Sequence, residues 1–308
     1  MVSRLLKQFD DVTELGRYIK QLKKAGVSKE LIEPFADKHG KEGLEWLLSK
    51  KHLGLSDDLL RKLLKADNLD DFTDDVLKAL KNSDGYADDI IEQIIKHGDD
   101  AAEAIGKYGD DAAEVIKDFG DDAVKDLKFG ATPKEIQNVQ KYLKGIVDGA
   151  GNIDAAQMRE IRLAIQNGKF SSREIKMLSK KMSELGITEA YESAMKNINF
   201  KEYLRKIKGE SPANMIDPHA HHILFKTGHG AAQQELVNEG QEILRKYGID
   251  PIVGEENLVW APNRVVGQHD TAALEKVVNA LKAVNEDGGS YDDIVRVLNM
   301  YGRIASER

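Results

Sequence analysis

Apolar residues recur at steps of three and four along most of this chain, which is the spacing of one face of an α-helix. Between residues 1 and 82, Gly26 followed by Ser28 indicates the end of one helix and the N-cap of the next. Ser56 ahead of two aspartates is a second helix start. We therefore expect short helices packed antiparallel in this region. Its first apolar stripe consists of Leu5, Leu6, Phe9, Val12, Leu15, Tyr18, Ile19 and Leu22.

Residues 83–130 repeat with a period of 11. Lys96–Ala101, Lys107–Ala112 and Asp118–Ala123 each place Gly-Asp-Asp-Ala after a ring-bearing residue. Each Gly would cost about 1 kcal/mol inside one continuous helix, but it suits the end of a short helix. Asp suits the N-cap and first turn of the next helix. We expect a stack of short helices, and not calcium loops, because the Asp-x-Asp-x-Asp-Gly order and its distal Glu are missing.

Explicit helix starts continue between residues 131 and 210. Pro133 is placed at the first position of a helix, Asn152 or Asp154 opens another, and Ser171–Glu174 reads as a capping box. Four or five helices are expected. The last one ends in a basic patch, and Gly209–Pro212 behind it suits a linker. The patch comprises Lys201, Arg205, Lys206 and Lys208.

The pattern changes in the C-terminal region, residues 211–308. Two apolar runs, Ala220–Phe225 and Asn257–Ala261, are short enough for strands. Helix-spaced runs follow each of them, at Ala231–Tyr247 and Thr271–Asn285, and a final helix is expected over Tyr291–Ala305. The sequence thus predicts a mostly α protein whose last region contains a short β-hairpin. We divide it into 1–82, 83–130, 131–210 and 211–308.

Composition limits the chemistry available to these regions. The 308 residues have room for two or three domains, and they include no cysteine. A metal site must therefore use His, Asn, Asp or Glu. No apolar run reaches the roughly 18 residues of a membrane span, and the start of the chain lacks the apolar core of a signal peptide. If the protein is exported, we expect a non-classical route.

The net charge of -8 is distributed unevenly. Residues 133–210 carry 15 Lys and Arg against 10 Asp and Glu, whereas residues 1–132 carry 21 against 29 and residues 211–308 carry 9 against 14. A nucleic-acid backbone would be attracted to the basic segment. An ordinary solvated helix face explains the same charges equally well.

Three histidines lie within four residues, at positions 219, 221 and 222, beside an apolar run. One imidazole can bind a divalent metal while another takes a proton near neutral pH. His221 and His222 would point to opposite faces of a strand, so a site that uses both belongs at a strand end where the chain bends. His219 follows a proline, and we expect it to end the preceding loop. His229 lies between two glycines and is either a loop residue or part of a substrate groove.

The motifs of this region resemble the AHH nuclease domain of the HNH/endonuclease VII superfamily, whose core is the ββα-metal fold. The resemblance rests on Ala220-His221-His222-Ile223, Gly248-Ile249-Asp250, Glu256–Pro262 and His269, and it covers residues 211–308. The superfamily implies that His221 ligates one divalent metal, Mg²⁺, Mn²⁺ or Zn²⁺, and that His222 is the general base. It implies that Asn257 holds the hairpin and orients His222, and that His269 is the last metal ligand, with Asn263 as the alternative.

The resemblance also implies a biological setting, because this family occurs as C-terminal toxin domains of bacterial polymorphic toxins. We would then expect a secreted endonuclease toxin that cuts DNA or RNA in the cytoplasm of a competitor and is blocked by a cognate immunity protein. The N-terminal region would engage a secretion-system component. The alternative is a non-catalytic helical interaction module in which the histidines form a structural zinc site.

Overall fold

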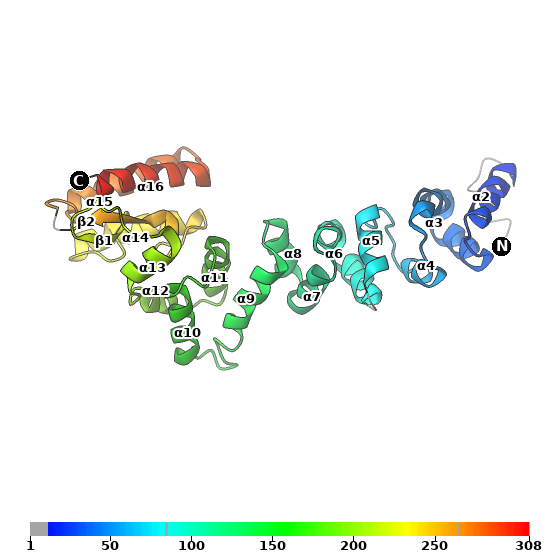
Figure 1. Cartoon of the computed structure of the whole chain (residues 1–308), viewed down its shortest axis with the longest axis horizontal. Coiled ribbons are helices and arrows are strands. Elements are labelled where there is room, and N and C mark those ends of the chain that lie inside the picture. The colour runs from blue at the N-terminus through cyan, green and yellow to red at the C-terminus, as the bar shows by residue number, and fades with distance from the viewer. Residues whose placement is uncertain (1–11, 84–85, 264, 308) are drawn as a thin grey trace. The chain divides into compact units, whose positions relative to one another are not determined.

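A computed structural model describes residues 12–83, 86–263 and 265–307. The chain divides into two compact units, Met1–Gln137 and Asn138–Arg308. Fifteen α-helices and one two-stranded antiparallel sheet lie in the described residues (Figure 1). The prediction of a mostly helical chain is thereby confirmed, and the two strands lie in the predicted last region. No helix in these ranges is long and apolar enough to cross a membrane.

The first unit begins with short helices built on buried leucines and aromatic residues. Ser56 caps α4 by accepting from the Leu59 N–H, as its sequence predicts. Gly40, with φ of 64°, breaks α3 into two helical pieces. The early part of the predicted apolar stripe, up to Phe9, lies outside the described residues. The helices are α2 (Val12–Lys24), α3 (Lys29–Lys50), α4 (Asp57–Leu63) and α5 (Asp74–Asn82), with the 3₁₀ turn η2 at Lys51–Leu53.

The 11-residue repeat forms α6 (Ala87–Tyr108), α7 (Asp110–Phe119) and α8 (Asp121–Lys128). Gly98, Gly109 and Gly120 have φ between 59° and 67°, a region that favours glycine, and each breaks the helix as predicted. The aspartates were expected at the N-cap and the first turn. They occupy the first turn, but the glycines themselves are the N-caps of α7 and α8 and no side chain caps there.

Five helices follow the repeat, which agrees with the prediction of four or five. Asp154, and not Asn152, caps α10 by accepting from the N–H groups of Ala156 and Gln157. Ser171 and Glu174 form the predicted capping box of α11. The helices are α9 (Pro133–Leu143), α10 (Ala155–Gln166), α11 (Ser172–Glu184), α12 (Thr188–Met195) and α13 (Phe200–Lys208).

The strands pair antiparallel, with His219 opposite Ala261 and His221 opposite Val259. The predicted short hairpin is instead a strand pair with a helix inserted, because α14 lies between β1 and β2 in the sequence. Two further helices complete the region, and buried aliphatic side chains of α14, α15 and α16 share a core with the residues after β1. The elements are β1 (Pro218–His222), α14 (Ala231–Lys246), the 3₁₀ turn η3 (Glu255–Asn257), β2 (Leu258–Pro262), α15 (Thr271–Glu286) and α16 (Tyr291–Ser306).

The basic helix α13 packs on this strand pair. The Tyr203 hydroxyl donates to the Val253 carbonyl at 2.7 Å, and the Lys208 ammonium donates to the Leu258 carbonyl at 2.7 Å. The Trp260 indole donates to the Gly209 carbonyl at 3.0 Å, which ties down the first residue of the predicted linker. Residues 138–210 and the histidine region therefore form one compact unit.

Candidate metal centre

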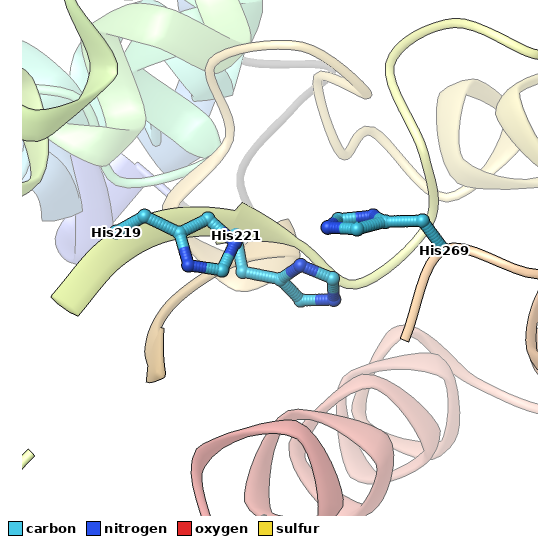
Figure 2. A group of neighbouring side chains, drawn as sticks. All are labelled: His219, His221 and His269. Atoms are coloured by element: carbon cyan, nitrogen blue, oxygen red, sulfur yellow. The ribbon is translucent and has the colours of Figure 1, made fainter. Parts of the chain in front are cut away.

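Three histidines converge at β1 (Figure 2). His219 and His221 are two residues apart on the strand, so their side chains share one face. His269 comes from the segment that leads into α15. One ring nitrogen from each lies within 4.8 Å of the other two. The ring centroids are 5.5 Å apart for the 219–221 pair, 5.2 Å for the 221–269 pair and 5.9 Å for the 219–269 pair.

The surroundings of two of these imidazoles favour their neutral form. Burial lowers the pKa of His219, and the neighbouring His269 lowers it further. Burial also lowers the pKa of the His269 ring, although this side chain is the most exposed of the three, and His229 adds to the effect. His221 is only 4% exposed. Because the neutral imidazole is the form that binds a metal, these lowered pKa values are compatible with metal binding.

The three side chains fit a divalent metal of the zinc type. Two nitrogens bonded to one zinc ion lie about 3.4 Å apart, given bonds of about 2.0–2.1 Å in a tetrahedron, so small side-chain rotations close the cluster. Both ring nitrogens of His219 are buried without a well-formed hydrogen bond, although the nearby Ala261 carbonyl favours its protonated form slightly. Three protein ligands leave a position open for substrate or water, as catalytic sites do.

The structure revises the predicted ligand set. His221 and His269 come together as expected, but His219, expected to end a loop, is the third member of the group. Strand alternation carries the signal, since positions 219 and 221 share a face. Asn263, the alternative ligand, is held by Asp217 through its N–H groups, and its role as a ligand stays a prediction. Its backbone N–H and side-chain amide donate to Asp217 at 3.1 and 3.2 Å, closing the open end of the strand pair.

His222 points away from the shared face of His219 and His221. Its Nε2 lies 2.9 Å from the Ile252 carbonyl, and its ring meets Phe200 edge to face at 4.5 Å between centroids. Burial lowers the pKa of His222 to about 4, with the Ile252 carbonyl opposing this and Lys226 adding to it. With its proton on Nε2, the neutral ring keeps a lone pair on Nδ1. β1 ends at His222, and not at Phe225 as the apolar run predicted. Although its ring is turned away from the shared face, His222 is among the residues that border the pocket of the three grouped histidines.

Asn257 fastens the strand pair, the first part of its predicted role. It is completely buried, its amide donates to the Leu224 and Pro251 carbonyls at 2.9 and 2.8 Å, and its oxygen accepts from the Leu224 N–H at 2.7 Å. These bonds go to backbone and not to His222. The predicted hydrogen bond from Asn257 to the base is therefore replaced by the Ile252 carbonyl, in a loop that Asn257 holds at Pro251.

Asp250 is a positioning residue that sequence reasoning missed. Its carboxylate accepts from the N–H groups of Ile252 and Val253, both at 2.9 Å, and so shapes the loop whose carbonyl meets His222. The side chain is only 2% exposed, and burial raises the pKa of this carboxyl group. An Asp two residues after a glycine that ends a helix is a turn signal, and it was available in the Gly248-Ile249-Asp250 motif.

Comparisons of the chain with family models, with curated proteins and with solved structures gave no match. The site must therefore be interpreted from its own geometry.

Proposed function

We propose that this protein is a metal-dependent endonuclease that hydrolyses nucleic-acid phosphodiester bonds. The observation that carries the proposal is the convergence of His219, His221 and His269 in a pocket of about 260 Å³ that His222 also lines. Three potential ligands and one separate neutral imidazole are the parts that hydrolysis requires. The resemblance of the motifs to the AHH nuclease domain supports the same reaction.

In this proposal the grouped histidines bind the metal and His222 is the general base. His219, His221 and His269 would hold one divalent ion, and three imidazole ligands suit Zn²⁺ better than Mg²⁺ or Mn²⁺. When bound, the ion would neutralise charge on the phosphate and on the departing oxygen. His222 accepts a proton from water at Nδ1 while the water oxygen bonds to phosphorus. The bond from phosphorus to the leaving oxygen breaks, and that oxygen takes a proton from solvent. The Ile252 carbonyl holds the His222 ring in the tautomer that leaves Nδ1 free.

The biological setting is part of the same proposal and rests on the resemblance alone. As a C-terminal toxin domain, the nuclease would act in the cytoplasm of a competing bacterium after export by a non-classical route. A cognate immunity protein would protect the producer. The helical first unit would then serve delivery, through a secretion-system component.

The alternative is a structural zinc site in a non-catalytic interaction module. Structural zinc sites are almost always closed by four protein ligands. The present group has three members, and one of them, His269, is exposed. An open site with an exposed ligand favours substrate access, so the geometry supports the nuclease better.

A cleavage assay with matched histidine variants tests this function. Full-length protein is incubated with plasmid, total RNA and tRNA in Mg²⁺, Mn²⁺, Zn²⁺ or EDTA. His221→Ala should lose both the metal and cleavage, whereas His222→Ala should keep the metal and lose about 10²- to 10⁴-fold in rate, the usual contribution of a general base. His52→Ala, which removes an exposed histidine of the first unit, is the control. Cleavage in EDTA, or full activity of His222→Ala, would refute the mechanism.

A further inference from the structure

The segment Lys226–Gly230 forms a second wall of the histidine pocket. Lys226, Thr227 and His229 line this pocket together with the three grouped histidines. Thr227 and His229 are exposed and Lys226 is half-buried. The residues that carry an ammonium, a hydroxyl and an imidazole group therefore border the same pocket as the candidate metal ligands. None of the described residues that line it is a carboxylate.

This wall is held in place by glutamines of α14. The N–H groups of Gly228 and His229 donate to Gln234 and Gln233 at 3.0 and 2.8 Å. The Gln233 amide also donates to the His269 carbonyl at 3.3 Å and to the Thr271 hydroxyl at 3.2 Å. Because Gln233 is only 6% exposed, it is a buried bridge that fixes the His229 backbone beside the segment carrying His269.

The N-terminal end of the wall is fixed in the same way. The Gln241 amide, 3% exposed, donates to the Phe225 and Lys226 carbonyls at 3.2 and 3.3 Å. Gly228 lies so close to α14 that an added Cβ would stand 2.3 Å from the Gln234 nitrogen. A loop that uses three glutamines and an obligatory glycine to set its backbone is a built wall, not a loosely attached connection.

The charge of the wall suits an anion. The Lys226 ammonium is 4.6 Å from the Phe200 ring centroid and donates to the Lys196 carbonyl at 3.2 Å, and neither partner neutralises it. The carboxylates that act on this region are Asp217 near His219 and Asp270 near His269, both on the side of the candidate ligands. The positive end of the pocket is thus at Lys226.

We propose that the Lys226–Gly230 loop binds a phosphate group of the substrate, with Lys226, Thr227 and His229 as its contacts. The inference rests on the proposed nuclease function, because it places the substrate phosphate between this loop and the grouped histidines. Ammonium, hydroxyl and imidazole N–H groups are donors to phosphate oxygens, and they supply charge and orientation without being metal ligands. The same chemistry would accept a phosphate of a nucleic-acid backbone or a free phosphate ion.

Binding measured without catalysis tests the loop. Full-length protein in EDTA is titrated with a short DNA duplex, a short RNA duplex and inorganic phosphate across a range of salt concentrations. Lys226→Met and His229→Gln should each weaken duplex binding by roughly tenfold, and Lys226→Met should lower the slope of log affinity against log salt by about 0.9. Lys246→Met removes the same charge from the far end of α14 and should match the wild type.

The possible results distinguish the phosphate-binding role of the loop from the proposed nuclease function. Zinc affinity of both loop variants should equal that of the wild type, and a loss of zinc in His229→Gln would overturn the assignment of His229 to phosphate. Duplex binding by the loop variants equal to that of Lys246→Met would overturn the loop itself, even if the wild type cleaves. Loop-dependent binding of inorganic phosphate alone, by a wild type that cleaves nothing, would support the loop and reject the nuclease.

Discussion

His221 and His222 are neighbours in the sequence and both are buried, but their side chains lie on opposite faces of β1. Of the histidines in this region, His222 has a strongly lowered pKa. It is 8% exposed, and burial in contact with the Phe200 ring penalises its charged form. A pKa of about 4 keeps the ring neutral at pH 7, as a general base must be, at the cost of basicity. The preceding residue, His221, groups with the other two candidate metal ligands, His219 and His269. The proposed roles of His221 as a ligand and His222 as a base therefore depend on strand alternation at the end of β1.

The free energy of unfolding should depend on pH through the protonation of His222. Its pKa is about 4 when folded and about 6.5 when unfolded, so the unfolded chain binds more protons between these values. Stability is then fully present above pH of about 6.5 and falls as pH drops toward about 4, by on the order of 3 kcal/mol from this group. Urea unfolding at several pH values should show a flatter profile for His222→Gln than for the wild type, and an equally steep profile would contradict this.

Many of the hydrogen bonds that position the residues of the site lie in the loops at the ends of β1 and β2. The strand pair is only five residues long on each side. Asn257 joins the backbone after β1 to the loop before η3, and the Ile252 carbonyl of that loop holds His222. The three glutamines of α14 perform the same task on the other wall. The site is therefore assembled from loops that buried amides attach to rigid elements.

Asn257→Ala should be strongly destabilising. The substitution leaves the Leu224 N–H and the Leu224 and Pro251 carbonyls without their partner in a completely buried position. We expect a loss of about 3 kcal/mol in the free energy of unfolding, since each buried unsatisfied group costs about 1–3 kcal/mol. Asn279→Ala, an exposed position on α15, is the control and should change little. Urea denaturation of both variants tests this prediction. Equal unfolding midpoints for Asn257→Ala and Asn279→Ala would reject the stabilising role of Asn257.

At the scale of the whole molecule, a negative net charge opposes binding of a nucleic acid, so the location of the positive charges matters. The chain carries -8 overall. Helix α13 contributes the exposed cations Lys201, Arg205 and Lys206, and it packs directly on β1 and β2. Arg205 pairs with Glu210, whereas the described residues provide no ion-pair partner for Lys201 or Lys206. The basic helix thus belongs to the same unit as the candidate metal centre, where cations can meet a phosphate backbone.

Charge removal on α13 tests this arrangement. Deletion of the helix is unsuitable, because Phe200 and Tyr203 pack against His222 and the Val253 loop. The double variant Lys201→Gln/Lys206→Gln should instead bind duplex DNA more weakly and reduce the salt slope by about 2. A matched double variant at two exposed lysines of α2, Lys23→Gln/Lys24→Gln, should leave the slope unchanged. Equal slopes for the two double variants would remove α13 from the binding surface.

The sequence by itself determined the helices and the candidate chemistry. Asp154 and the Ser171 capping box start helices where predicted, and Gly109 ends one, because these signals act over four residues or fewer. The helix breaks within the 11-residue repeat could be predicted because each depends on a glycine and the residues beside it. The histidine motif and Asn257 were also visible in the chain, since residue type alone limits which side chains can bind a metal.

Only the tertiary structure decided how these residues are grouped. His219 joins His221 and His269 because β1 pairs with β2 and turns one face toward the segment before α15. His222 finds its partner in the carbonyl of Ile252, which is 30 residues away in the sequence. Gln241 holds the start of the Lys226–Gly230 segment from 15 and 16 residues away, whereas Gln233 and Gln234 bind its N–H groups from four and six residues away and are local contacts. Contacts between distant segments depend on chain topology and packing, which short-range sequence signals do not encode.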